Sequence, residues 1–176
     1  HGHMEQVGYD TYCNLLDQVI KEMKDIPQEE EKDFQIDLNV SSYIPKEYIS
    51  DSSQKIKIYQ DIALCRNEDD VQNIIDEMID IYGEMPKQVE NLLNIARIKF
   101  IAKKLYILKI QQKANGVVFS FDGERFNFDI VDKLLKEYKN KIKFSPGKEP
   151  YITYKIEELS DDKILKEIQK FLDFLS

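Results

Sequence analysis

Histidine and glycine are scarce in this chain of 176 residues, and their scarcity excludes several kinds of active site. The two histidines, His1 and His3, belong to residues 1–4, a His-Gly-His-Met start that resembles a cloning remnant. The rest of the chain therefore has no imidazole to act as a general base or metal ligand at neutral pH. The six glycines never form the GxxxxGK[ST] loop that holds nucleotide phosphates. We expect no nucleotide hydrolysis by this segment.

Cysteine is also rare, and long apolar runs are absent. Cys13 and Cys65 lack the paired spacing of a zinc or redox site. Neither has a sequence neighbourhood that would activate a thiol, so we expect both to be reduced and buried. Since no apolar run reaches the length of a membrane span and the chain does not begin with an apolar signal segment, we expect a cytoplasmic protein without a membrane partner.

Acidic residues exceed basic ones, with 33 Asp and Glu against 25 Lys and Arg, which gives a net charge of -8. A general nucleic-acid binder depends on Lys and Arg contacts to phosphates, so this balance argues against direct nucleic-acid binding by the segment. A basic protein surface is the partner that the charge favours. With 42% hydrophobic residues, the chain is able to bury a core as one domain.

The stretch from Glu68 to Tyr106 has the strongest pattern in the chain and predicts two consecutive helices. Gly83 can end the first helix, and Pro86 suits the first turn of the second. The apolar face predicted for the first helix comprises Val71, Ile74, Ile75, Met78, Ile79 and Tyr82. The opposite, polar face comprises Asp69, Asn73, Asp76, Glu77 and Asp80. The second helix is predicted to run through Val89, Leu92, Leu93, Ala96, Phe100 and Leu105.

Helix capping explains only part of the acidity of the first of these helices. Asn67 is a suitable N-cap, and the acidic residues at 68–70 lie in the first turn, where the helix dipole favours negative charge. Asp76, Glu77 and Asp80 lie beyond that turn and have no such explanation. They could in principle share a divalent cation, but the sequence offers no second set of oxygen ligands, so we expect a solvated or partner-binding face with no metal and no cofactor.

The remaining chain mixes strands and helices with short connections, which predicts an α+β fold. We expect a helical hairpin packed with a small mixed or antiparallel sheet and a C-terminal helix. The predicted elements are a helix over 7–24, a strand over 34–40, a turn over 43–49, a helix capped by Asp51 that buries Ile56, Tyr59, Ile62, Ala63 and Cys65, a hairpin of strands 117–121 and 125–128 around Asp122-Gly123, a helix over 130–138, strands over 142–144 and 151–156, and a helix capped by Ser160.

Two groups of side chains resemble binding sites but have simpler explanations. Lys99, Lys103 and Lys104 on the second helix of the hairpin could contact nucleic acid, but pairing with the acidic helix or plain solvation explains them. Four tyrosines could form a ligand cage, but such residues are more often aromatic side chains at the edge of a core. These are Tyr43, Tyr48, Tyr59 and Tyr82.

Three strings in the chain resemble one protein family. They are VGYDTYCNLLDQVI, YIPKEYISDSSQKIKIYQDIA and IIDEMIDIYGEMPKQVENLLNIARIKFIAKKL. Together they are similar to the C-terminal region of the bacterial transcription-repair coupling factor family, Mfd, over about Gln6 to Leu108. The resemblance implies a helix from the end of the helicase motor over 5–24, a linker over 25–33 and the regulatory (TRCF) domain over 34–176.

The resemblance also implies a function for the full-length relatives. They are ATP-dependent double-stranded DNA translocases that displace stalled RNA polymerase and recruit UvrA in nucleotide-excision repair. ATP and Mg²⁺ belong to motor domains that this chain lacks, so the segment itself is expected to be non-catalytic. In the family the regulatory domain docks onto the protein's own UvrA-binding module and masks it.

The family's docking residues are an acidic pair in the string ELID-x-x-G. The string EMIDIYG of this chain places that pair at Glu77 and Asp80, and Asn73 and Asp76 on the same helix face complete the expected partner-binding set. The chain departs from the family at Ile81, where a basic residue is usual, and at Tyr106, where glycine is usual. An alternative is an adaptor surface for an external protein such as RNA polymerase or a repair factor; a carboxylate-metal enzyme is the third reading.

Overall fold

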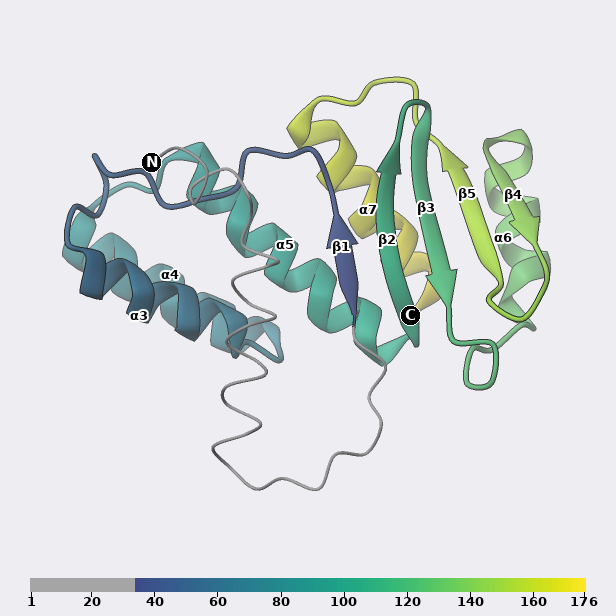
Figure 1. Cartoon of the computed structure of the whole chain (residues 1–176), viewed down its shortest axis with the longest axis horizontal. Coiled ribbons are helices and arrows are strands. Elements are labelled where there is room, and N and C mark those ends of the chain that lie inside the picture. Colours follow the sequence, from purple (N-terminus) through teal and green to yellow (C-terminus); the bar gives the residue numbers. More distant parts are fainter. Residues whose placement is uncertain (1–33) are drawn as a thin grey trace. The chain divides into compact units, whose positions relative to one another are not determined.

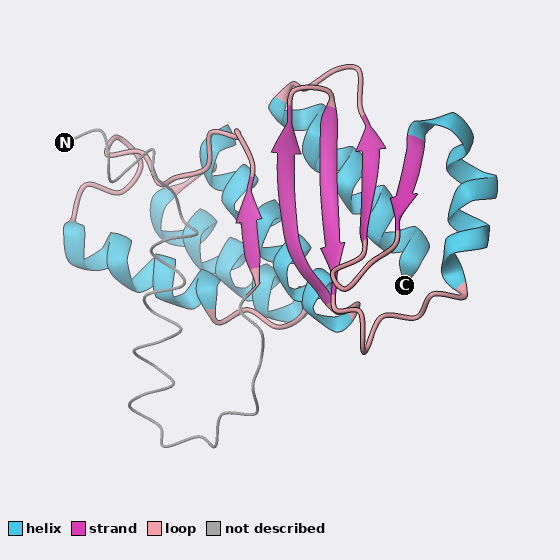
Figure 2. Cartoon of the chain, turned by 45° about the vertical axis from the view of Figure 1, so that its right-hand side comes forward, coloured by secondary structure: helices cyan, strands magenta, loops and turns pink. Residues whose placement is uncertain are grey.

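The structure, a computed structural model, describes residues 34–176, which form two compact units. The first comprises Val40–Phe100, and the second comprises the residues up to Asn39 together with Ile101–Ser176. The predicted helix over 5–24, the linker over 25–33 and Cys13 lie outside the described residues. The first unit is helical and the second contains the sheet, so the described residues together confirm the α+β prediction (Figures 1 and 2). The boundaries of a regulatory domain over 34–176 stay a prediction.

The first unit consists of helices α3 (Ser52–Ala63) and α4 (Glu68–Tyr82) and most of α5 (Lys87–Lys104), preceded by an extended segment and a turn. Each predicted cap is present: Asp51 accepts a hydrogen bond from the backbone N–H of Gln54, and Asn67 accepts one from the N–H of Asp70. The apolar faces of the three helices form the core of this unit. Its fully buried members include Ile44, Ile49, Ile62, Met78, Leu92, Leu93 and Ile98.

Two isoleucines predicted to face this core lie at the surface instead. Ile56 of α3 is 45% exposed and Ile79 of α4 is 48% exposed, whereas Ile58 of α3 is buried. The buried stripe of α4 is narrower than predicted because only Val71, Ile74 and Met78 are buried along it. A single helix in contact with its neighbours along one side buries only the centre of a wide apolar face.

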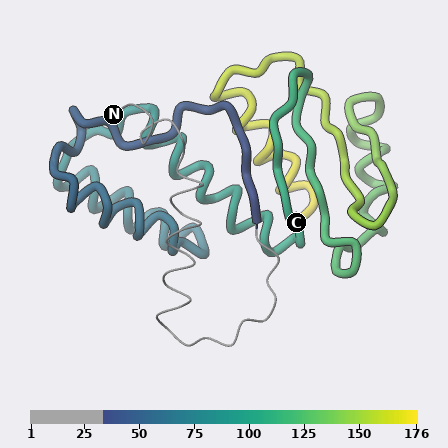
Figure 3. The backbone as a smooth tube through the Cα atoms, viewed as in Figure 1, coloured from purple at the N-terminus to yellow at the C-terminus, as the bar shows by residue number. Residues whose placement is uncertain are grey.

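The second unit is a five-stranded sheet with the order β1-β2-β3-β5-β4. β1 runs parallel to β2, and every other neighbouring pair is antiparallel. The strands are β1 (Gln35–Asp37), β2 (Ile107–Lys113), β3 (Gly116–Phe121), β4 (Ile142–Ser145) and β5 (Tyr151–Lys155), and the helices are α6 (Ile130–Tyr138) and α7 (Asp161–Leu175), with a short 3-10 turn at Lys139–Lys141. Figure 3 follows the chain from β2 through a tight turn directly into β3.

Helices α6 and α7 pack against one face of this sheet (Figure 2). Phe171 of α7 stacks on Phe119 of β3 with ring centroids 4.3 Å apart, and Tyr138 of α6 meets Tyr154 of β5 edge to face at 5.2 Å. The apolar face of α7 is buried and comprises Ile164, Leu165, Ile168, Phe171, Leu172 and Leu175. Ser160 occupies the predicted N-cap position, but its hydroxyl donates to Glu158.

The predicted hairpin around Asp122-Gly123 is wrong. β3 pairs with β2 on one side and β5 on the other, and residues 125–128 form turns. Asp122 holds this turn, since its carboxylate accepts from the N–H of Glu124 and its carbonyl accepts from the N–H of Arg125 and Phe126. Gly123 lets this turn pass close to the backbone at Lys148, because a Cβ at position 123 would lie 2.9 Å from the carbonyl oxygen of Lys148. The strand β2 was missed because its apolar residues Ile107 and Ile110 continue the helical spacing of α5.

Tyr106 ends α5 with a left-handed backbone. Its φ is 58°, and its N–H donates to the carbonyl of Lys103 in the last turn of the helix. Such a conformation favours glycine, the residue that the family resemblance led us to expect at this position. The departure noted at Tyr106 therefore lies where the chain turns from helix into β2.

Candidate protein-docking surface

The N-terminal half of α4 is fixed by its own acidic residues. The N–H of Asp70 donates to the capping side chain of Asn67, and the carboxylate of Asp70 accepts a hydrogen bond from the N–H of Arg66 at 2.9 Å. Glu68 accepts two short hydrogen bonds from the guanidinium of Arg97 on α5, at 2.9 and 2.7 Å. This forked pair joins the start of α4 to α5. Two of the three first-turn acids, Glu68 and Asp70, therefore have structural partners.

The four residues predicted to bind a partner lie together on the outer side of α4. We call Asn73, Asp76, Glu77 and Asp80 the acidic face; all four are exposed. Asp76 accepts a hydrogen bond from the amide of Gln72 at 2.9 Å, one turn earlier on the same helix. In the described part of the chain, neither Asn73 nor Asp80 has a side-chain partner. Asp80 therefore makes no side-chain contact in the described part of the chain that would stabilise α4.

Glu77 differs from Asp80 because α3 supplies it with a counter-charge. Its carboxylate lies 3.9 Å from the ammonium of Lys57, and both side chains are substantially exposed. Asp61 of α3 belongs to the same cluster. Burial raises the pKa of Asp61, Glu77 raises it further, and Lys57 opposes the rise. The edge between α3 and α4 is thus a mixed-charge cluster with only a weak ion pair at Glu77.

Apolar side chains flank the acidic face on both sides. Ile81 is 59% exposed and Ile79 is 48% exposed, so neither belongs to the buried side of α4. Ile81 follows Glu77 by one helical turn, so it lies next to that carboxylate on the helix surface. Ile79 was predicted from its spacing to face the core, and Ile81 was predicted only to depart from the family pattern; the structure leaves both at the surface. A surface with charged residues beside exposed isoleucines is typical of a protein-binding site rather than of a simple solvated helix.

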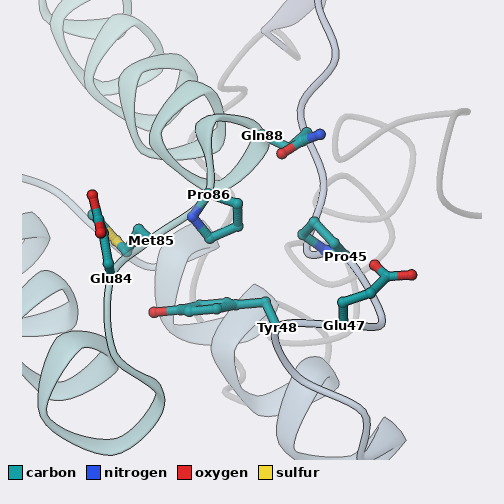
Figure 4. A pocket seen from close by; sticks show the side chains of 7 residues that line it. All are labelled: Pro45, Glu47, Tyr48, Glu84, Met85, Pro86 and Gln88. Carbon is teal, nitrogen blue, oxygen red and sulfur yellow. The ribbon is translucent and has the colours of Figure 1, made fainter.

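An open pocket of about 550 Å³ follows the C-terminal end of α4 (Figure 4). Tyr48 forms one wall, and the rings of Pro45 and Pro86 lie beside it, with the carboxylates of Glu47 and Glu84 at opposite ends. The remaining lining residues are Met85 and Gln88. The pocket extends the acidic character of α4 past Gly83 and adds an aromatic surface.

Three tyrosines of the first unit use their hydroxyl groups in hydrogen bonds within the chain. Tyr48 donates to the carbonyl of Gly83 at 2.9 Å, and Tyr82 donates to the side chain of Gln54 at 2.7 Å. Tyr59 accepts from the N–H of Ile44 at 2.8 Å. Burial, and secondarily Tyr82, raises the pKa of Tyr48 above its usual value. These hydroxyls are engaged with the chain itself and do not form a ligand cage.

Neither metal chemistry nor thiol chemistry is indicated by the arrangement. Among the described residues, no group of three His, Cys, Asp or Glu side chains could hold a metal ion. Cys65 is buried, and burial raises the pKa of its thiol to about 11, so the thiolate is scarce at neutral pH. No helix within residues 34–176 is long and apolar enough to cross a membrane.

A family model described as the TRCF domain matches residues 38–129, more than half of the chain. The chain belongs to the TRCF domain family. The acidic face, the pocket and Tyr106 all lie within the matched residues. Within the matched residues, α4 of this chain carries both the capped, Arg97-bound start of the helix and its exposed acidic end.

Two relatives of this TRCF domain are proteins named transcription-repair-coupling factor. The protein from Rickettsia prowazekii is 35% identical over 176 residues, covering 97% of this chain and 15% of the relative. The Bacillus subtilis protein is 34% identical over 125 residues, covering 70% of this chain and 11% of the relative. The chain therefore spans a small part, about 15% or less, of the length of these relatives.

A solved structure confirms the fold of this TRCF domain. It is described as the crystal structure of the C-terminal domain of transcription-repair coupling factor, and it matches 84% of this chain and 95% of its own chain. The TM-score is 0.74 at 25% sequence identity. The family and the α+β fold expected from the sequence are both confirmed.

Proposed function

We propose that this TRCF domain is a non-catalytic regulatory segment of a transcription-repair coupling factor, and that its acidic face docks on the protein's own UvrA-binding module. In the parent protein, an ATP-dependent translocase that displaces stalled RNA polymerase, this contact masks the module until it is needed. The domain then acts by occupying a surface. Its partner presents basic residues to Asp80 and Glu77.

The observation that carries the proposal is the environment of Asp80. This carboxylate is exposed on a well-formed helix and has no side-chain partner among the described residues, while Asp70 is engaged in capping and Glu68 in the pair with Arg97. An unpaired charge at this position does not stabilise the helix. A basic side chain brought by a partner would complete it.

The exposed isoleucines supply the apolar part of such a contact. Ile79 and Ile81 flank the acidic face, so a partner that pairs with the carboxylates also covers apolar surface. In protein interfaces, charge pairs chiefly set orientation and association rate, while buried apolar anchors contribute most of the affinity. The combination suits a contact that forms and opens reversibly.

The free energy expected for this contact is suited to reversible docking. Loss of one well-placed charge pair at an interface costs about 1 to 3 kcal/mol, which changes an equilibrium between closed and open forms by roughly five- to 150-fold. A domain held by two such pairs and a small apolar contact can therefore be released by a competing partner. It does not need to unfold.

The test uses the full-length parent protein with Glu77→Arg and Asp80→Arg together. We expect the variant to remain folded and to bind UvrA in the absence of polymerase at least tenfold more tightly than the wild type, as measured by calorimetry. Glu124→Arg with Glu149→Arg is a matched control, since it makes the same charge change at exposed loop positions of the second unit. The control should leave UvrA binding unchanged.

Unchanged UvrA affinity in the double variant would overturn the masking role. The adaptor alternative gives a different outcome: UvrA binding stays as in the wild type, while binding of an external protein such as RNA polymerase falls. A mixture of the TRCF domain with the isolated UvrA-binding module should also show an association that weakens as salt is raised.

A further inference from the structure

The face of the sheet opposite to α6 and α7 is open and basic. Alternate residues of each strand point to it, and strand register places four lysines on it: Lys109, Lys113, Lys143 and Lys155. We call this the lysine face. Three of the four are exposed, and Lys109 is half-buried. Asp37 of β1 is the acidic residue that the described strands place there.

Helices α6 and α7 of the second unit lie on the other face of the sheet. Phe171 of α7 and Tyr138 of α6 contact Phe119 and Tyr154, whose side chains alternate with those of the lysine face. Figures 1 and 2 show α6 and α7 on the same side of the sheet. Neither helix therefore shields the lysines.

The basic character of this face is not apparent from the net charge of the whole chain. Residues of the second unit from Phe34 to Asn39 and from Ile101 onward include 15 Lys and Arg and 13 Asp and Glu, whereas the whole chain has 25 and 33. The excess of acid thus resides in the other residues. The total charge of the chain therefore does not exclude nucleic-acid binding by a face on which three strands bring lysines together.

The chemistry of the face points to phosphate more than to protein. Its other residues are mostly small or polar, including Ser120, Ser145, Thr153 and Gln111, with Val118 half-buried between them. Protein interfaces need an apolar centre and are depleted of lysine, whereas nucleic-acid interfaces are polar and basic. Hydroxyl and amide side chains beside lysines are the groups that commonly contact phosphate and sugar.

The shape favours a single strand over a duplex. Adjacent strands lie roughly 4.8 Å apart, so the lysines on β2 and β4 are separated by about 14 Å. A flat sheet of this width does not enter the major groove, which is about 12 Å wide. Tyr151, 41% exposed on the same face and in register with Ser120 and Ser145, offers a ring on which an unpaired base can stack.

We propose that the lysine face binds the phosphate backbone of single-stranded nucleic acid, with a base stacked on Tyr151. This site lies in the second unit and is independent of the acidic face and of the function proposed above. Lys113 and Lys155 flank Gly116 in register, so no side chain stands between them. The pair is the centre of the expected phosphate contact.

Fluorescence anisotropy of a labelled 20-nucleotide poly(dT) strand with the full chain tests this proposal. We expect binding at 50 mM NaCl that falls steeply by 200 mM, with a log–log salt slope of about -3 for four lysines on a single strand. Lys113→Ala with Lys155→Ala should reduce that slope by about 1.4. Tyr151→Ala should weaken binding roughly tenfold, and Tyr151→Phe should retain it.

Lys133→Ala with Lys136→Ala is the matched control, because it removes two exposed lysines of the same unit from α6 on the covered side. It should leave binding and its salt slope close to wild type. An equal loss in this control would overturn the proposal, as would absence of binding at 50 mM NaCl. Competition by polyglutamate as effective as by unlabelled poly(dT) would show an acidic-protein site instead, and tighter binding of a duplex of the same length would also overturn it.

Discussion

Glu77 of α4 lies 3.9 Å from Lys57 of α3, whereas Asp80, three residues later on α4, has no partner in the described part of the chain. Glu77 and Asp80, two of the three carboxylates of the acidic face, are therefore not equivalent. An incoming basic side chain meets a free charge at Asp80 and a partly compensated one at Glu77. Lys57 also lies close enough to repel a basic partner, so it is expected to limit the affinity of docking.

Replacing Lys57 should consequently strengthen docking. Lys57→Ala removes both the weak ion pair with Glu77 and the repulsion of a basic partner, and we expect the affinity for the UvrA-binding module to rise about two- to fivefold. Calorimetry at low and moderate salt measures the change, which should shrink as salt is added. Lys133→Ala on α6 is the control for loss of one positive charge. Weaker docking in Lys57→Ala would contradict the idea that the partner is basic.

Ile81 should matter for docking and very little for folding. Because its side chain is 59% exposed, Ile81→Ser should change the free energy of unfolding by less than about 0.5 kcal/mol. Covering it in a complex would make the same change cost about 1 to 2 kcal/mol in docking. Leu64→Ser, at a 45% exposed position outside the acidic face, is the comparison. Equal docking by Ile81→Ser and the wild type would show that the partner does not cover this side of α4.

Tyr106 should be replaceable by glycine but not by valine. Its φ of 58° costs an L-residue about 1 to 2 kcal/mol, a strain that glycine avoids at an entropic cost of about 0.5 to 1 kcal/mol. The free energy of unfolding of Tyr106→Gly should therefore lie within about 0.5 to 1 kcal/mol of the wild type. Tyr106→Val should lose about 1 to 2 kcal/mol, because a β-branched side chain tolerates this conformation less well than tyrosine does. Urea unfolding followed by circular dichroism distinguishes them.

Tyr151→Val provides the matched control for this prediction. Tyr151 has a similar exposure, 41% against 45% for Tyr106, but it lies in β5, where valine is well suited. A loss in Tyr151→Val as large as in Tyr106→Val would mean that the tyrosine ring, rather than the backbone conformation, accounts for the effect.

Glu167 should contribute stability that depends on pH. The hydroxyl of Tyr154 donates to its carboxylate at 2.6 Å, and this hydrogen bond, with help from Lys163 and Lys170 and against the effect of burial, lowers the pKa of Glu167 below its usual 4.5. Since the folded pKa lies below the unfolded one, protonation favours the unfolded chain. The stabilisation is complete above the unfolded pKa and is lost as pH falls through the folded pKa.

We expect Glu167→Gln to lower the free energy of unfolding at pH 7 by about 1 to 2 kcal/mol and to reduce its fall between pH 5 and pH 3. Urea titrations at several pH values measure both effects. Glu149→Gln, at an exposed loop position, should preserve the pH dependence. A pH profile of Glu167→Gln that parallels the wild type would show that the hydrogen bond from Tyr154 does not depend on the charge of Glu167.

Local signals in the sequence were sufficient for most of the helices. Asp51 and Asn67 cap α3 and α4 as predicted, because a cap needs only a side-chain oxygen and the N–H groups three residues on. The failures were of another kind. Asp122-Gly123 has the composition of a hairpin turn, but β3 already has partners on both sides, so the turn leads away from the sheet.

The acidic face shows the same division. Sequence alone separated the first-turn acids of α4 from Glu77 and Asp80, because the reach of a helix cap and dipole is short and is set by position along the chain. It could not show that Lys57 compensates Glu77, since that pairing depends on how α3 packs beside α4. Nor could it show that Ile79 and Ile81 stay at the surface, because burial depends on what lies opposite each side of the helix.

The sequence by itself thus determined the family, the α+β class, the helix ends and the residues of the acidic face, all of which depend on the order and spacing of residues within short stretches. Only the tertiary structure decided which acids are already paired, which apolar residues remain exposed and that lysines from β2, β4 and β5 share one open face of the sheet. These properties arise from contacts and register between segments distant in the chain. The physical reason is that side-chain burial and charge pairing are set by neighbours in space, whereas helix capping and periodicity are set by neighbours in sequence.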